Sequence, residues 1–122
     1  MLWVQELTDC TETEAAAVAH FKEGDFAVAN GAVLETALVE CVAQTVAAAQ
    51  GERARRTGKG AASVGGMLAA ITDFRIQTRA PLGKPLQIEV RELKRFGPML
   101  LVSAEVKCDE QLIASGQLSL YA

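Results

Sequence analysis

Residues 31–50, GAVLETALVECVAQTVAAAQ, decide the fold, because they predict one long helix with very few polar side chains. Ala, Leu and Gln favour helix, Asn30 is placed to cap its N-terminus, and Gly51 is placed to end it. At 1.5 Å per residue the segment would be about 30 Å long. Apolar residues occupy its whole circumference rather than one stripe, which predicts a helix that is buried all round.

Three polar residues interrupt this helix at intervals of four positions. Thr36, Glu40 and Gln44 would therefore form a row along one side. A membrane span is excluded, because an acid near the centre of a helix costs about 2.5–3.5 kcal/mol on insertion. We expect instead that a sheet wraps round the helix. Burying a carboxylate is costly, so an acid without a function would not be expected at this position. Glu40 is therefore a candidate functional residue.

The composition restricts the classes of function. A length of 122 residues predicts a single domain, residues 1–122. The net charge of −3 argues against nucleic-acid binding through the general electrostatic field. Three cysteines without C-x-x-C spacing argue against a disulfide framework and a structural zinc site. We expect no metal and no cofactor, no signal peptide at the start MLWVQELTD, and a cytoplasmic protein.

The segments around the helix predict an antiparallel sheet. Strands are expected at residues 2–8 and 14–21, and residues 52–63 are expected to form a mobile basic loop. Propensity alone would favour an alanine-rich helical turn at 14–21, but the run is short and loop-like residues follow it at 22–25, which favours a strand. Four strands with alternating apolar residues follow, and the first places Leu68, Ala70, Thr72, Phe74 and Ile76 on one face. Short connections between strands make neighbours antiparallel. The sequence therefore predicts an α+β fold with the sheet curled round the helix.

Two motifs and the order of elements resemble a known family. Residues 40–44 read E-C-V-A-Q, and residues 80–90 read APLGKPLQIEV, with L-K-R at 93–95. These segments are similar to the E-x-x-x-Q, P-x-x-P-G-D-x-L-x-x-E-V and L-K-R segments of the hotdog-fold 3-hydroxyacyl-[acyl carrier protein] dehydratases. Residues 26–31 look like the compact helix entry of the aryl-polyene subgroup. The resemblance implies a homodimer or higher oligomer with active sites between subunits, and an acyl thioester or acyl carrier protein as partner.

The chain departs from this family at the histidine. The family motif H-F-P-G-x-P-x-x-P-G is rich in proline, whereas no proline follows His20 and Phe21 before the helix. Either His20 is the family histidine with an insertion after it, or the loop is shortened and His20 belongs to the second strand. We favour the shortened loop. The usual catalytic pair would then be incomplete in this chain, and the enzyme altered or inactive alone.

The resemblance assigns roles to residues of the helix and its entry. In the resembled enzymes the matching acid works with a histidine to remove the proton alpha to the thioester carbonyl and to protonate the leaving hydroxyl, and Glu40 would keep its part of that role. His20 is the candidate for the histidine, although a lone histidine on a strand is more often a packed or surface residue. Asn30 and Gly31 would bind substrate, because a glycine at a helix start exposes N–H groups at the positive end of the dipole. Gln44 would orient Glu40 or tie down backbone.

The basic segment after the helix is a candidate docking site. Arg53, Arg55, Arg56 and Lys59 could bind an acidic carrier protein or a phosphopantetheine phosphate, although solvated charge on a loop is the simpler interpretation.

Cys41 points away from Glu40 round the helix, so we interpret it as a core residue.

Three functions remain open from the sequence. The first is dehydration of 3-hydroxyacyl thioesters on a carrier protein, which the E-x-x-A-Q motif favours. The second is thioester hydrolysis, since the same fold family includes thioesterases with an acid on this helix. The third is a non-catalytic acyl-binding subunit that completes a heterodimer, which the missing proline loop favours.

Overall fold

The computed structural model describes residues 4–21, 28–29, 32–33, 35–58 and 68–121. Its elements follow the predicted order, with one additional pair of very short strands before the helix. They are β1 (Val4–Cys10), β2 (Glu14–His20), β3 (Val28–Ala29), β4 (Ala32–Val33), α1 (Glu35–Arg56), β5 (Leu68–Ile76), β6 (Pro85–Phe96), β7 (Met99–Cys108) and β8 (Gln111–Tyr121).

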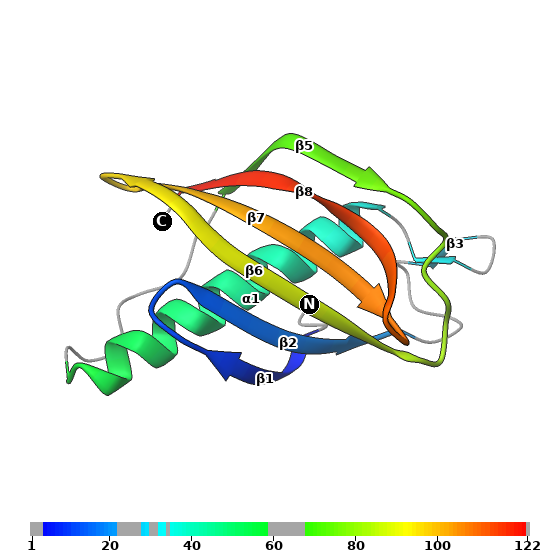
Figure 1. Cartoon of the computed structure of the whole chain (residues 1–122), viewed down its shortest axis with the longest axis horizontal. Coiled ribbons are helices and arrows are strands. Elements are labelled where there is room, and N and C mark those ends of the chain that lie inside the picture. The colour runs from blue at the N-terminus through cyan, green and yellow to red at the C-terminus, as the bar shows by residue number, and fades with distance from the viewer. Residues whose placement is uncertain (1–3, 22–27, 30–31, 34, 59–67, 122) are drawn as a thin grey trace.

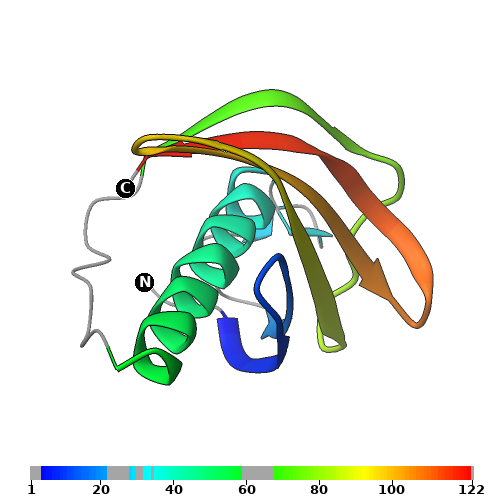
Figure 2. The same ribbon diagram turned by 60° about the vertical axis from the view of Figure 1, so that its left-hand side comes forward.

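Six of these strands form one antiparallel sheet in the order β1-β2-β6-β7-β8-β5. The sheet curls over α1, with β2, β6, β7 and β8 in its middle and β1 and β5 at its edges (Figure 1). The turned view shows that the curl stays open along one side of the helix (Figure 2). The predicted α+β architecture, a curled antiparallel sheet wrapped round one helix, is confirmed.

Alternation along the strands separates an inner face, which packs on α1, from an outer face. On β2 the side chains of Ala15, Ala17 and Ala19 are buried, while those of Glu14, Ala16, Val18 and His20 point away from the core. Register extends this division across the sheet, because residues directly opposite each other share a face. The inner face therefore includes Leu86, Ile88 and Val90 on β6, Val102, Ala104 and Val106 on β7, and Leu118 and Leu120 on β8.

The helix begins and ends later than predicted. The predicted start at Gly31 is wrong, because Ala32–Val33 form a strand that pairs with Val28–Ala29 and α1 begins at Glu35. Asn30 and Gly31 themselves lie outside the described residues. The predicted end at Gly51 is also wrong. The helix continues to Arg56, and Gly58, with a φ of 73°, is the glycine that ends it.

The basic segment is consequently not a loop over its whole length. Residues 52–56 form the last turns of α1, which places Arg53, Arg55 and Arg56 at the negative end of the helix dipole. Basic side chains are stabilising at that position, which is one reason why the helix extends through Gly51. The remaining residues of the predicted loop, from Lys59 to Ser63, lie outside the described part of the chain.

The prediction of a helix buried all round is wrong. Its buried side chains are Ala37, Leu38, Cys41, Val42, Ala43, Thr45, Val46 and Ala49, whereas Glu35, Thr36, Glu40 and Ala48 are exposed. The reason is that the sheet curls round the helix without closing, so one side of α1 is left uncovered. No helix within the described residues is long and apolar enough to cross a membrane.

A β-bulge in β5 changes which residues face inward. Ile71 pairs with Leu118 and Asp73 pairs with Gln117, so Thr72 is an extra residue that reverses the alternation. The predicted shared face of Ala70, Thr72 and Phe74 is therefore wrong, and Ile71 shares its face with Phe74 and Ile76 instead. Opposite Phe74 lies Gly116, where a Cβ would be only 1.7 Å from the carbonyl oxygen of Asp73.

Candidate functional site

Glu40 lies in the second turn of α1, on the side of the helix that the sheet does not cover. Its side chain is exposed, as is that of Thr36 one turn earlier, and Gln44 one turn later is half-buried. The predicted polar row therefore exists and borders the open side. The prediction that Glu40 is buried is wrong for the single chain. The argument that a buried carboxylate must have a function therefore does not apply to it.

Gln44 connects this row to the edge strand β1. Its side-chain Oε1 accepts a hydrogen bond of 3.1 Å from the backbone N–H of Val4. Of the two roles considered for Gln44, the structure shows the one in which the amide ties down backbone. The contact also restricts the rotamer of Gln44 and so fixes the wall of the open side next to Glu40. A direct bond from Gln44 to Glu40 stays a prediction.

Cys41 follows Glu40 but is fully buried in the core. Burial, together with the negative charge of Glu40, raises the pKa of the Cys41 thiol to about 12. A thiol with such a pKa is protonated at neutral pH and is a poor nucleophile. The interpretation of Cys41 as a core residue is confirmed.

His20 is the last residue of β2, as the shortened-loop alignment predicts. Its strand neighbour Ala19 is buried against Leu86 on the inner face, so His20 and its partner Pro85 belong to the outer face. The sheet thus separates His20 from α1. Within one chain the structure does not bring His20 and Glu40 together.

Two of the three arginines at the end of α1 hold the turn between β1 and β2. Arg53 donates from Nε to the carbonyl oxygen of Thr11 at 2.6 Å and from Nη2 to that of Glu14 at 3.3 Å. Arg56 donates from Nη1 to the carbonyl oxygen of Cys10 at 2.7 Å. These contacts anchor the β1–β2 hairpin to the helix, a structural role that the sequence did not indicate.

Arg55 is the most exposed of the three arginines. Its side chain is 74% exposed and pairs only locally, from Nε to Oε2 of Glu52 at 3.1 Å. Hydrogen bonds from Arg55, and secondarily from Arg56, hold the pKa of Glu52 below its ordinary value. Arg55 is therefore the residue of this group whose charge is best placed to meet another molecule. Lys59, the fourth predicted docking residue, lies outside the described part of the chain.

Glu40 does not line any of the three principal hollows formed by the described residues. One hollow of about 610 Å³ lies on the outer face of the sheet and is lined by residues of β1, β2, β5, β6, β7 and β8. Among the residues that the structure describes, no group of three or more His, Cys, Asp or Glu side chains could hold a metal ion. The helix therefore offers a carboxylate on an open side rather than a finished pocket.

Comparison with solved structures shows the hotdog fold. The chain is similar to the dehydratase heterocomplex ApeI:P from Xenorhabdus doucetiae, with 16% identity, a TM-score of 0.80, and coverage of 98% of this chain and 82% of that one. It is also similar to an uncharacterised protein from Pyrococcus horikoshii, with 13% identity, a TM-score of 0.72, and coverage of 98% and 83%. A third similar structure is a hypothetical thioesterase with coenzyme A from Streptococcus pneumoniae, with 8% identity, a TM-score of 0.69, and coverage of 95% and 83%.

Comparison with sequences supplies the family. No curated protein matches the chain. A family model described as ApeP-like, ApeP dehydratase, matches residues 1–122. This agrees with the resemblance of the helix motif and the downstream strands to the dehydratases, and of residues 26–31 to the aryl-polyene subgroup. The chain belongs to the ApeP-like dehydratase family.

Proposed function

We propose that this protein dehydrates 3-hydroxyacyl thioesters carried by an acyl carrier protein, with Glu40 as its general acid–base. The observation that carries the proposal is the position of Glu40, in the E-x-x-A-Q motif and on the uncovered side of α1. Dehydration requires a base that takes the proton alpha to the thioester carbonyl and an acid that protonates the departing β-hydroxyl. A carboxyl group can perform either step if substrate reaches it, and Glu40 is accessible.

We further propose that a second hotdog chain completes the site. His20, the other candidate for proton transfer, lies beyond the sheet from Glu40, so the missing group would have to come from another subunit. The edge strand β5 supports this proposal. Ile71 and Ile76 on β5 are 52% and 38% exposed, and an apolar edge strand left open is prone to pair with another chain. Such pairing would also cover the open side and form an apolar tunnel beside Glu40.

A non-catalytic partner subunit is the second candidate function. The observation that favours it is the same outward position of His20, which leaves one chain without the usual pair of groups. The similar ApeI:P structure is a heterocomplex, so a second, different chain is a reasonable source of the missing group. In that case Glu40 would shape a site whose chemistry belongs to the partner.

Product analysis separates these functions. The purified protein, alone and after mixing with a candidate hotdog partner, is incubated with a 3-hydroxyacyl thioester on holo acyl carrier protein, and the products are identified by mass spectrometry. The proposal predicts the enoyl thioester. Release of the free 3-hydroxy acid would show a thioesterase instead. Activity that appears only with the partner, and that persists in the Glu40→Gln variant, would identify a non-catalytic subunit.

A further inference from the structure

A row of exposed apolar side chains lies at the end of the sheet formed by the β6–β7 hairpin. Phe96 pairs with Met99, and Met99 pairs with Tyr121, so the three side chains share the outer face. Phe96 is 51% and Tyr121 is 43% exposed, and Leu93, the extra residue of a bulge beside this row, is 44% exposed. These are three of the five large hydrophobic side chains that are exposed within the described residues.

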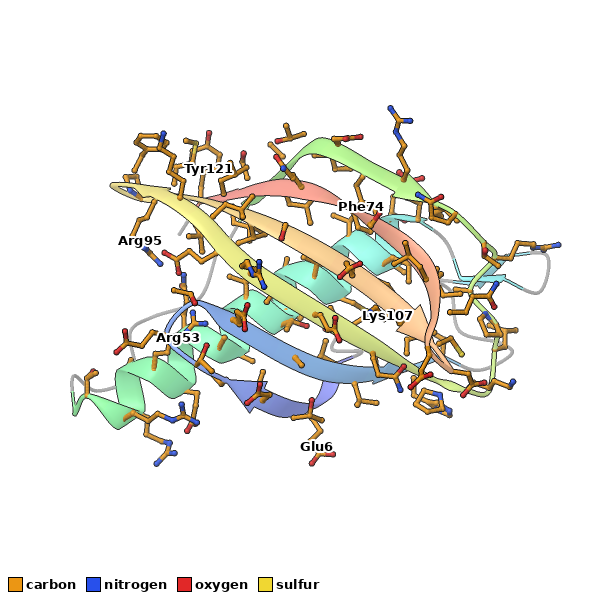
Figure 3. All side chains as sticks on the ribbon, viewed as in Figure 1. Glu6, Arg53, Phe74, Arg95, Lys107 and Tyr121 are labelled. Atoms are coloured by element: carbon orange, nitrogen blue, oxygen red, sulfur yellow. The ribbon has the colours of Figure 1, made fainter. Side chains whose placement is uncertain are left out.

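Basic side chains gather at the same end of the molecule. Figure 3 shows Tyr121, Arg95 and Arg53 along one end, where the β6–β7 hairpin and the C-terminus of α1 both lie. The amino group of Lys94 lies 4.7 Å from the centre of the Phe96 ring, a cation–π contact. Arg53 and Arg95 thus lie at the same end as Tyr121, on a chain whose net charge is −3.

We propose that the docking row, defined as Phe96, Met99 and Tyr121 with Lys94, binds the acidic surface of the acyl carrier protein. This inference rests on the proposed function and names the surface by which the carrier is recognised. The two rings would act as anchors, since aromatic side chains dominate interface energies and lose little entropy on binding. Lys94 is already held against Phe96, so its charge is presented in a restricted position.

Charge and geometry favour this occupant over a second copy of the chain. In a symmetric contact between two copies, each docking row would face the other, and the two Lys94 side chains would repel. A lipid surface is disfavoured because most of the nearby cations are already paired. Arg91 binds Glu14, Arg95 binds Glu92 and Arg55 binds Glu52. A protein partner with a few acidic groups beside an apolar surface would be complementary to Lys94 and to the rings of Phe96 and Tyr121.

A tight turn next to the docking row holds its side chains in place. Gly97 and Pro98 form the two-residue turn between the paired residues Phe96 and Met99, and Gly97 has a φ of 54°. A glycine with positive φ at the first turn position matches the twist of the flanking strands. A rigid hairpin holds both rings in place before binding, which lowers the entropic cost of docking.

Binding of holo acyl carrier protein without an acyl group tests the proposal. Fluorescence anisotropy of the labelled carrier is measured with the wild-type protein and with Phe96→Ala, Lys94→Glu and Lys84→Glu. Lys84 is the matched control, since it is exposed and pairs with Asp109 at the opposite end of β6. We expect the first two variants to weaken binding at least about tenfold and Lys84→Glu to leave it unchanged.

Two further measurements separate this proposal from the proposed function. Lys94→Glu should dehydrate a carrier-free 3-hydroxyacyl pantetheine thioester at the wild-type rate, and Glu40→Gln should bind the carrier normally while losing activity. Wild-type carrier binding by both docking-row variants would overturn the proposal. So would an equal loss in Lys84→Glu, a change of oligomeric state in Phe96→Ala, or a loss of binding to anionic vesicles without a loss of carrier binding.

Discussion

Replacing Gly116 with Ala should detach β5 from the sheet, whereas the same substitution at Gly51 should stabilise the protein. At Gly116 the new Cβ would lie 1.7 Å from the carbonyl oxygen of Asp73 and 2.4 Å from the Cα of Phe74. Both atoms belong to backbone, so no side chain can move aside. Increasing the shorter distance to 3.0 Å requires a displacement of at least 1.3 Å between β8 and β5.

The magnitude follows from what this displacement breaks. Overpacking alone typically costs about 1–3 kcal/mol. A shift of this size also breaks at least one neighbouring ladder hydrogen bond, at about 0.5–1.5 kcal/mol each. We therefore expect a loss of about 3 kcal/mol in the free energy of unfolding. At Gly51 a Cβ would meet nothing within 4 Å, and replacing a glycine inside a helix with alanine should stabilise by about 0.8–1 kcal/mol.

Urea unfolding and amide hydrogen exchange provide the assay. The unfolding midpoint should fall for Gly116→Ala and rise for Gly51→Ala, and in Gly116→Ala the amides of β5 should lose protection before those of β7. A Gly116→Ala variant as stable as the wild type would refute the close approach of β5 to β8. A destabilised Gly51→Ala variant would refute the assignment of residue 51 to a helix interior.

Three further predictions concern a turn, a clamp and a thiol. Glu110, with a φ of 68°, should tolerate Gly with a gain of up to about 1 kcal/mol, because a left-handed conformation costs a non-glycine residue roughly 1–2 kcal/mol; thermal unfolding measures it, with Glu105→Gly in a strand expected to destabilise. Arg56→Ala should lower stability by about 1–2 kcal/mol through loss of its bond to the carbonyl of Cys10, whereas Arg55→Ala should leave it unchanged because its ion pair is exposed to solvent. Equal losses in parallel urea titrations would contradict the clamp. Cys41 should resist alkylation at pH 8 until the protein unfolds, and rapid labelling of the folded protein would contradict its burial. Burial raises the pKa of the Cys41 thiol from 9.0 to about 12. Its contribution to stability should therefore be complete below pH 9, and the free energy of unfolding should fall as the pH rises from 9 towards 12.

The predictable part of the fold came from turn signals and strand length. Residues 14–21 are rich in alanine and would favour helix by propensity, but their shortness and the loop-like residues after them indicated a strand, and β2 is observed at Glu14–His20. The turn between β6 and β7 was equally predictable, because Gly97 and Pro98 are typical turn residues. In the Asp109-Glu110 turn both residues have positive φ, which is common for Asp but uncommon for Glu.

The incorrect predictions have a common cause. The sequence pattern within one helix or strand does not show which of its faces another element will cover. Glu40 has apolar neighbours in sequence, yet it lies on the side of α1 left open by the sheet. The Thr72 bulge reverses the alternation of β5 and depends on the absence of a side chain at Gly116, a residue far along the chain. The position of His20 relative to Glu40 likewise depends on which face β2 turns towards the helix.

The role of Glu40 as general acid–base can be tested by measuring the rate at which Glu40→Gln dehydrates a 3-hydroxyacyl thioester on holo carrier protein. Glu35→Gln is the matched control, because Glu35 is also exposed on α1 but lies outside the row of Thr36, Glu40 and Gln44. We expect a loss of about 10²–10⁴-fold for Glu40→Gln, with unchanged stability and oligomeric state, and no loss for Glu35→Gln. Full activity in Glu40→Gln would contradict this role.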